Sequence, residues 1–315
     1  MAAGTGINRA MTAREWMLLV ALAILWGAGY PLLTVAVREF PPLTLTLLRV
    51  ALAAMMLHVI IRAMGLRLPA DRESWTMFAG QAFLNNIIPF SLISWGQLYI
   101  PGGVTSVLVA STPFFTVIAA HYFTSDEKMT PLRVSGVLLG MAGVATIIGP
   151  AAFTHFGIDV FGELAIVGAA ISYTIAGLYG RRAGARGIAP IATATGMLTM
   201  STVIMLPIAL IVDRPWGLAP PSIEAWLCLI AIALPSTALG YLIFFRILAS
   251  AGATNIMLVT FLLPVTAVLL GVTWLGERLE HRHFAGMALI ALGLSAIDGR
   301  VWQRWRRGRS PAAAE

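Results

Sequence analysis

The sequence is poor in the residues that a water-soluble protein needs at its surface. Only 11% of its 315 residues are charged, whereas soluble domains have roughly 25%. A single cysteine, Cys228, excludes a disulfide framework. The only close pair of histidines, His281 and His283, has no third metal ligand nearby in the sequence, and there is no Gly-rich phosphate loop. We therefore expect no catalytic residue, metal or cofactor, and the sequence favours neither a membrane-embedded enzyme nor an ATP-driven pump.

In place of charge the sequence has long apolar runs, with 58% hydrophobic residues and a mean hydropathy of +0.85. A transmembrane helix needs about 20 predominantly apolar residues. The runs that fit are residues 16–37, 43–61, 75–97, 103–123, 131–150, 160–180, 188–212, 223–245, 253–274 and 283–299. The first, of about 22 residues, is too long for a signal-peptide core. The sequence predicts an all-α integral membrane protein with ten transmembrane helices and short loops.

The net charge of +7 could suggest a nucleic-acid partner, but the basic residues lie between the apolar runs, where membrane orientation explains them better. Ten spans place both termini on one side of the membrane. Most Lys and Arg residues fall on that side, and those expected on the other side are Arg38, Arg214, Arg278 and Arg282. By the positive-inside tendency, both termini are predicted to be cytoplasmic. The expected partners are the lipid bilayer and a small-molecule solute, with a monomer favoured.

Two stretches of the sequence, residues 102–148 and 251–297, match each other. Glutamate and glycine recur at an offset of 150 positions, in the pairs Glu127 and Glu277, Gly136 and Gly286, and Gly143 and Gly293. The repeat unit therefore has five spans, and because five is odd, the two units enter the membrane from opposite faces. Residues 1–150 and 151–315 are predicted to form two inverted five-helix repeats, an architecture typical of secondary transporters with a solute site near the midplane.

The chain also resembles a known family. The stretches that carry the resemblance are "ILWGAGYPLLT" at residues 24–34, "LRVALA" at residues 48–53, and the repeated Glu…Gly…Gly pattern. They resemble EamA-type members of the drug/metabolite transporter superfamily, with amino-acid exporters of the YddG kind as the nearest fit. The resemblance implies a bacterial inner-membrane exporter of small polar metabolites, above all aromatic or neutral amino acids, that works by alternating access. Another metabolite, a drug or a nucleotide-sugar-like solute is the alternative, and a channel is less expected.

Residues halfway along the spans predict the solute site. In both halves these are aromatic, amide and hydroxyl side chains, namely Trp26, Tyr30, Asn85, Asn86, Tyr173 and Ser236, and Tyr241 in the inner half of the eighth span is included in the predicted site. Two adjacent asparagines are costly against lipid, and their donors and acceptors suit the ammonium and carboxylate of an amino acid. The alternatives are simple packing for each aromatic residue and interhelical hydrogen bonding for the asparagines.

Trp95 and Tyr99, at the end of the third span, are candidates for a gate to the outer vestibule, with an interfacial aromatic belt as the alternative. Arg49 is the one basic residue that no loop, tail or helix end accounts for. It lies about 10 Å along the second span from Pro42. It is predicted either to attract a substrate carboxylate or to make a structural contact with helix-end carbonyls or with Glu163.

Energy coupling is expected to be absent or weak, with proton antiport through Glu15, Glu163 or His121 as the alternative. Glu127 and Glu277 lie in turns just before helices, where a carboxylate is expected to stabilise the helix N-terminus. The glycine rows "GVLLGMAG" and "GMALIALG" are expected to let helices approach closely inside the bundle, with a dimer surface as the alternative.

Overall fold

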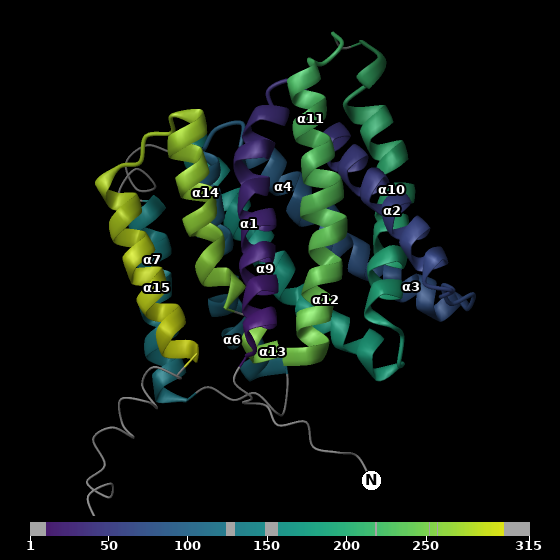
Figure 1. Ribbon diagram of the computed structural model, residues 1–315. Helices are drawn as coiled ribbons and strands as arrows, with labels where there is room; N and C mark the ends of the chain where they lie inside the picture. The colour runs from purple at the N-terminus through teal and green to yellow at the C-terminus, as the bar shows by residue number, and fades with distance from the viewer. Residues whose placement is uncertain are drawn as a thin grey trace, which may run out of the picture.

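The computed structural model describes residues 11–123, 130–148 and 157–298, apart from residues 218, 252 and 257, and all of its regular elements are helices (Figure 1). The first half contains α1 (Ala13–Ala36), α2 (Pro42–Ala63), α3 (Arg72–Ala82), the π-helix η1 (Phe83–Ile87), α4 (Ile88–Gly96), α5 (Gly102–Val109), α6 (Thr112–Phe123) and α7 (Pro131–Ile148). The second contains α9 (Ile158–Ala185), α10 (Pro190–Val212), the 3₁₀ turn η2 (Pro215–Gly217), α11 (Ile223–Ala231), the π-helix η3 (Ile232–Leu239), α12 (Gly240–Ala251), α13 (Ala253–Ile256), α14 (Val259–Leu275) and α15 (His281–Asp298).

Each predicted apolar run coincides with a helix or with helices in line. Six helical segments are long and apolar enough to cross a membrane, at Ala13–Ala36, Pro42–Ala63, Gly102–Phe123, Ile158–Gly180, Pro190–Val212 and Ile223–Ile247. Pro131–Ile147 and Leu262–Leu275 are shorter apolar helices. The predicted third span, residues 75–97, is not among these because it carries Gln81, Asn85, Asn86 and Ser91. The protein is thus an all-helical membrane protein.

The helices begin and end where local chemistry favours it. Thr12 and Glu15 form a capping box at the start of α1, and Pro42 occupies the first turn of α2, where a missing N–H costs nothing. Ser222 caps α11 by accepting a hydrogen bond from the Ala225 N–H. Gly276 ends α14 in the left-handed conformation, with φ +64°. These signals divide the apolar sequence into separate helices.

The two π-helices begin 149 positions apart, at Phe83 and Ile232, which is close to the offset of the sequence repeat. A π-helix shifts the backbone hydrogen-bond ladder and is often found at functional sites. Side chains satisfy carbonyls in these segments. Ser172 Oγ donates to Leu84 O at 2.7 Å, and Thr237 Oγ1 donates to Ile232 O at 2.8 Å. Both halves therefore interrupt their third long segment at equivalent positions.

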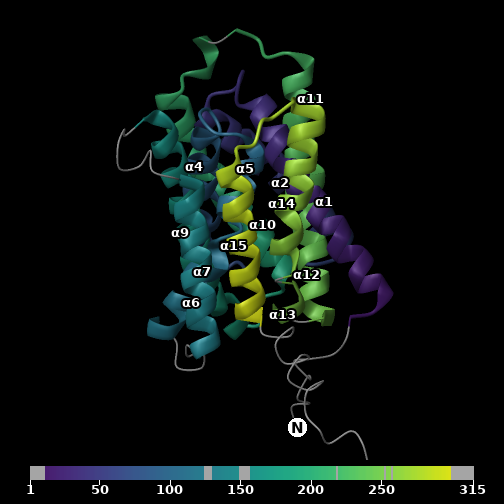
Figure 2. The same ribbon diagram turned by 90° about the vertical axis from the view of Figure 1, so that its left-hand side faces the viewer.

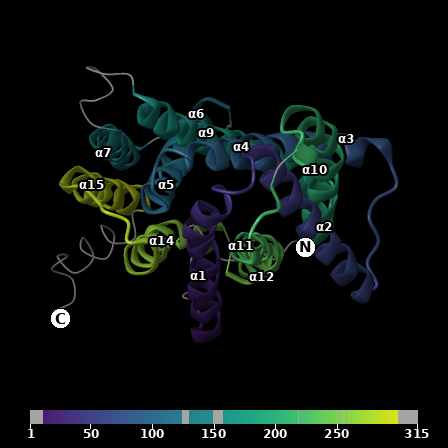
Figure 3. The ribbon, with the colours of Figure 1, turned by 90° about the horizontal axis from the view of Figure 1, so that it is seen from above.

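The two halves interleave rather than lie side by side. Helix α1 of the first half packs on α11, η3, α12 and α14 of the second half. Helix α9 of the second half packs on α3, η1, α4, α5 and α6 of the first half. Across the halves α2 packs on α10 and α7 on α15, as Figures 2 and 3 show from the side and from above. Buried residues such as Leu33, Leu108, Ile166 and Leu229 form the largest core cluster between these elements.

The glycine rows lie between α7 and α15. A Cβ atom at Gly136 would lie 2.7 Å from Gly293 O, and one at Gly143 would lie 2.8 Å from Gly286 O. The backbones of the two helices are therefore in direct contact, which only glycine permits. This confirms the prediction that the rows serve packing inside the bundle.

The bundle has two ends. Helix α1 begins and helix α15 ends at the same end of the bundle, which is at the bottom of Figure 1 and is called the terminal end below. The turns that follow α1, α4, α10 and α14 lie at the other end, called the opposite end. Since successive long segments alternate in direction, this arrangement requires an even number of passes, and the count of ten stays a prediction.

Candidate functional site

Arg49 lies on α2 inside the bundle and contacts both halves of the chain. Its Nε donates a hydrogen bond to Thr237 Oγ1 at 2.9 Å, and its guanidinium carbon lies 3.8 Å from the centre of the Phe90 ring. The second contact is a cation–π interaction. Among the described residues no carboxylate forms an ion pair with Arg49, and Glu163, the predicted alternative partner, does not contact it. The Arg49 guanidinium therefore contacts the Thr237 hydroxyl and the Phe90 ring, and no counter-ion is found among the described residues.

Three tyrosines from different helices surround this charge. Tyr30 of α1, Tyr173 of α9 and Tyr241 of α12 are close enough to interact electrostatically with Arg49, and all three are half-buried. The three were predicted from sequence positions more than 60 residues apart. The fold brings them together because α1 and α9 each cross into the other half of the bundle.

An aromatic group adjoins Tyr241 on the terminal side. The Trp26 ring lies edge-on to Tyr241 with centroids 6.4 Å apart, and stacks on Phe244 at 5.6 Å. Tyr241 in turn stacks on Phe245 at 6.0 Å. These spacings are those of attractive aromatic pairs. All four side chains are half-buried, so they retain exposed ring surface.

A hydrogen-bonded chain fixes the Tyr241 hydroxyl. Asn85 Nδ2 donates to Tyr241 Oη at 2.9 Å, and Tyr241 Oη donates to Asn86 Oδ1 at 3.3 Å. Asn86 Nδ2 then donates to Ser201 Oγ on α10 at 2.9 Å. Asn86 is completely buried, whereas Asn85 is half-buried and also approaches the Met197 sulfur at 3.6 Å. Asn86 thus forms interhelical hydrogen bonds, which was the alternative to solute binding. Its contact with a solute stays a prediction.

Ser236 lies at a packed contact between α1 and η3. A Cβ atom at Gly29 would lie 3.0 Å from Ser236 Oγ, and Ser236 is buried. Its neighbour Thr237, rather than Ser236, reaches Arg49. Trp95 and Tyr99 pair with each other, with ring centroids 5.2 Å apart, at the end of α4, and Tyr99 is 37% exposed. The structure places this pair at the opposite end, outside the central group, and their role as a gate stays a prediction.

Sequence reasoning missed several members of the group, namely Phe90, Phe244 and Phe245. The phenylalanines resemble any packing residue in an apolar helix, so no local signal marks them. Thr237 is adjacent to a predicted residue, but its pairing with Arg49 joins positions 188 apart in the sequence. Only the packing of α2 on η3 reveals it.

The three candidates for proton coupling lie elsewhere. The Glu15 carboxylate accepts hydrogen bonds from Thr12 in the capping box of α1. Glu163 is buried on α9 at the opposite end, within electrostatic reach of Arg282. His121 lies edge-on to Tyr122 at 5.0 Å near the end of α6. None of the three joins the group around Arg49 among the contacts that the structure describes.

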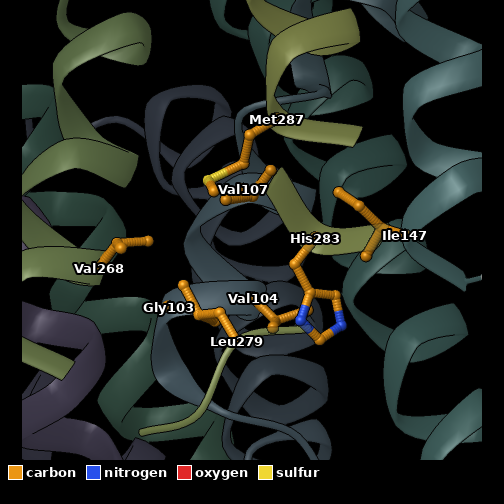
Figure 4. A pocket seen from close by; sticks show the side chains of 8 residues that line it. All are labelled: Gly103, Val104, Val107, Ile147, Val268, Leu279, His283 and Met287. Carbon is orange, nitrogen blue, oxygen red and sulfur yellow. The ribbon is translucent and has the colours of Figure 1, made fainter. Parts of the chain in front are cut away.

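Two hollows lie outside this group. One lies between α5, α7, α14 and α15 and holds no space for a water molecule; Figure 4 shows its lining, which consists of Gly103, Val104, Val107, Ile147, Val268, Leu279, His283 and Met287. The other, of about 510 Å³, is at the terminal end between α3 and α9, where Arg186 forms ion pairs with Asp71 at 3.1 Å and with Glu73. Within the described residues no three His, Cys, Asp or Glu side chains cluster as metal ligands would.

Comparisons with known proteins agree with this architecture. The model of the EamA-like transporter family matches residues 14–149 and again residues 160–297. The uncharacterized transporter YvbV of Bacillus subtilis is 28% identical over 90% of this chain and 92% of its own length. A probable terminal-alkyne amino-acid exporter of Streptantibioticus cattleyicolor is 24% identical over 93% and 96% of the two chains. A crystal structure with 21% sequence identity superimposes with a TM-score of 0.64 over 95% of this chain and all of the other, which shows the fold alone.

Proposed function

Because the chain belongs to the EamA-like transporter family, we propose that it is a secondary transporter that exports small metabolites carrying a carboxylate, above all aromatic and neutral amino acids, by alternating access. Family and relatives are transporters rather than enzymes. The proposal includes ten membrane-crossing helices in two inverted five-helix repeats, residues 1–150 and 151–315. It also places the protein in the inner membrane with both termini in the cytoplasm. The two family matches and the equivalent positions of η1 and η3 support the inverted repeats.

The observation that carries the substrate class is the environment of Arg49. A guanidinium inside a membrane protein is costly unless an anion or several acceptors compensate its charge. Here the partners are one threonine hydroxyl, one phenylalanine ring and nearby tyrosines. Because no carboxylate among the described residues neutralises Arg49, a solute carboxylate is the partner that this site lacks. Arginine suits that partner through paired hydrogen bonds.

The aromatic group gives the proposal its side-chain preference. Trp26, Tyr241, Phe244 and Phe245 are half-buried and pack together, and Tyr241 is also near Arg49. A solute held by its carboxylate at Arg49 would extend a planar or apolar side chain toward these rings. Aromatic stacking of this kind contributes about 0.5–1.5 kcal/mol per pair beyond the area that it buries. The name of the Streptantibioticus relative, an amino-acid exporter, supports the same solute class.

The hydrogen-bonded chain through Asn85 and Asn86 supports a positioning role. It fixes the hydroxyl of Tyr241. Tyr241 is one of the three tyrosines near Arg49, and it also belongs to the aromatic group. A tyrosine held in this way presents its ring in one orientation, which favours selective binding. We propose uncoupled or weakly coupled export, since Glu15, Glu163 and His121 lie outside the group.

The test is solute exchange in liposomes that contain the purified protein. We expect aromatic and neutral amino acids to exchange and to compete with one another. Amino-acid amides that lack the carboxylate, and sugar-linked solutes, should compete poorly. If no amino acid moves or competes, the proposed solute class is wrong although the family stands. Exchange that requires an imposed pH gradient would contradict the uncoupled mechanism.

The same assay tests Arg49 directly. Arg49→Met should lower exchange by about 100-fold, because a charge-assisted hydrogen bond contributes about 1.5–3 kcal/mol. Arg49→Lys keeps the charge but loses the planar pair of donors, so we expect an intermediate rate. Arg62→Met is the matched control, since Arg62 lies in the last turn of the same helix, away from the group. Normal exchange by Arg49→Met would refute a role in substrate binding.

A further inference from the structure

The Glu277 carboxylate binds a helix of the other half of the chain. Its two oxygens accept hydrogen bonds from the first backbone N–H groups of α5, Gly102 N–H at 2.8 Å and Gly103 N–H at 3.0 Å. The prediction that Glu277 stabilises a helix N-terminus is therefore confirmed, but the helix differs from the expected one. The capped helix is α5 rather than α15, which follows Glu277 in the sequence. Glu127, its counterpart in the repeat, lies outside the described residues.

Three glycines make this contact sterically possible. A Cβ atom at Gly103 would lie 3.0 Å from the Glu277 Oε2 atom, and one at Gly271 would lie 2.8 Å from its Cδ atom. Gly276, with φ +64°, turns the chain so that Glu277 N–H returns to Gly271 O at 3.0 Å. Figure 4 shows Gly103 close to Val268 of α14 in this region. The local backbone thus holds the carboxylate in place against α5.

The contact lies directly beside the proposed solute site. A Cβ atom at Gly102 would lie 3.0 Å from the backbone carbonyl of Tyr30 and 2.9 Å from Thr34 Oγ1. The N-terminus of α5 is therefore pressed against the helix segment that carries Tyr30, one of the residues near Arg49. The Glu277 contact therefore holds the N-terminus of α5 close to α1 beside the site.

A buried polar side chain, Gln97, lies in the turn between α4 and α5. Both amide atoms of Gln97, at the end of α4, are buried without a hydrogen-bond partner among the described residues, and the side chain is only 4% exposed. Such a group destabilises the packed state unless another state gives it partners. Gln97 lies seven residues after Phe90, two helical turns along the same face of α4, and Phe90 contacts Arg49.

We propose that Glu277 is the latch of the outward gate: its carboxylate holds α5 against α1 and α14 in the state that is closed at the opposite end, and release of α5 opens that end and exposes Gln97. This inference rests on the proposed alternating-access function. Glu277 makes charge-assisted hydrogen bonds to two N–H groups at once, and a neutral amide side chain has only one acceptor oxygen. Replacing Glu277 by glutamine therefore weakens the closed state without changing the size of the side chain.

The experiment measures how fast a cysteine at position 97 reacts. The parent protein carries Cys228→Ala, which removes the one native thiol, together with Gln97→Cys. The purified protein in detergent is treated with a bulky, charged maleimide, so that both ends are open to the reagent. We expect Glu277→Gln to raise the labelling rate at least about tenfold, as the loss of one charge-assisted hydrogen bond implies. Glu277→Asp, which is too short to reach both N–H groups, should give an intermediate rate.

Glu224→Gln is the matched control, because Glu224 is an exposed carboxylate at the same end, in the first turn of α11. It should label at the parent rate. Equal labelling of the parent and of Glu277→Gln would overturn the latch, as would an equal rise in Glu224→Gln. If Glu277→Gln aggregates on size-exclusion chromatography, Glu277→Asp decides by the same criteria. Since labelling needs no solute, a wrong solute class would leave this result unaffected, and a failed latch would leave the exchange assay unaffected.

Discussion

The two ends of the bundle occupy equivalent places in the repeat but are built differently. At the opposite end, α5 packs on α1 and α14. At the terminal end, the described part of its counterpart α13 packs on α12, and Ile256 is fully buried in a core cluster with Leu19, Leu22 and Ile247. One sequence pattern therefore produces two ends that pack against different partners. An alternating-access transporter must be able to exchange these two arrangements.

The bonds that join the halves differ between the ends as well. At the opposite end three carboxylates cap helices of the other half. Glu277 caps α5, Asp213 binds the Thr44 N–H and hydroxyl on α2, and Glu39 binds the Ser222 N–H and hydroxyl at α11. Among the described residues at the terminal end, the ion pairs of Arg186 with Asp71 and Glu73 join the two halves, and the two carboxylate side chains are well exposed. Caps satisfy backbone donors that have no other partner, whereas exposed ion pairs contribute little.

For the comparison of the two ends, the largest expected effect comes from preventing the close approach of α5 to α1. Gly102→Leu places a side chain against the Tyr30 backbone, which cannot move aside as a flexible side chain could. We expect solute exchange to fall by more than about tenfold and stability to fall by about 1–3 kcal/mol through overpacking. Gly177→Leu is the control, because a Cβ atom at Gly177 meets nothing within 4 Å. Unchanged exchange by Gly102→Leu would mean that close approach of α5 is not needed.

Removing one of the caps should have a moderate effect on stability. In the native protein the Asp213 carboxylate accepts hydrogen bonds from the Thr44 N–H at 2.6 Å and from the Thr44 hydroxyl at 2.8 Å. Asp213→Ala removes this acceptor, and both donors belong to a buried residue. We expect a loss of about 1–2 kcal/mol in denaturant or thermal unfolding. Glu73→Ala at the terminal end breaks only an exposed ion pair and should change stability little. Equal losses from the two variants would remove the proposed difference between the ends.

The smallest expected effect is a pH dependence at Glu39. Hydrogen bonds from the Ser222 N–H and hydroxyl lower the pKa of the Glu39 carboxyl below its value in the unfolded chain. The folded state therefore binds this proton less tightly than the unfolded state, so the contribution is complete above the unfolded pKa and is lost as pH falls through the folded one. Thermal unfolding of the native protein and of Glu39→Gln should differ at neutral pH and converge in acid. A difference that stays constant down to the lowest pH would contradict this assignment.

The sequence predicted the helices better than it predicted their partners. The apolar runs and the turn residues between them are local signals, so the segment bounds agree with the structure to within a few residues. Tyr30, Tyr173, Tyr241 and Arg49 were singled out because polar groups are costly inside an apolar helix, and the fold brings these four together. The same reasoning could not find Phe244 or the pairing of Arg49 with Thr237, because aromatic packing and long-range contacts leave no local trace.

The sequence by itself determined that the chain is an all-helical membrane protein built from a repeat, because hydropathy and repeat spacing depend only on the order of residues. It also showed that Arg49 is a charged residue inside a predicted transmembrane span rather than in a loop. The tertiary structure decided what surrounds that charge and which helix Glu277 binds. Both depend on how α1 and α9 cross between the halves. A repeated sequence treats both ends alike, so only the packed molecule shows which partners each end has.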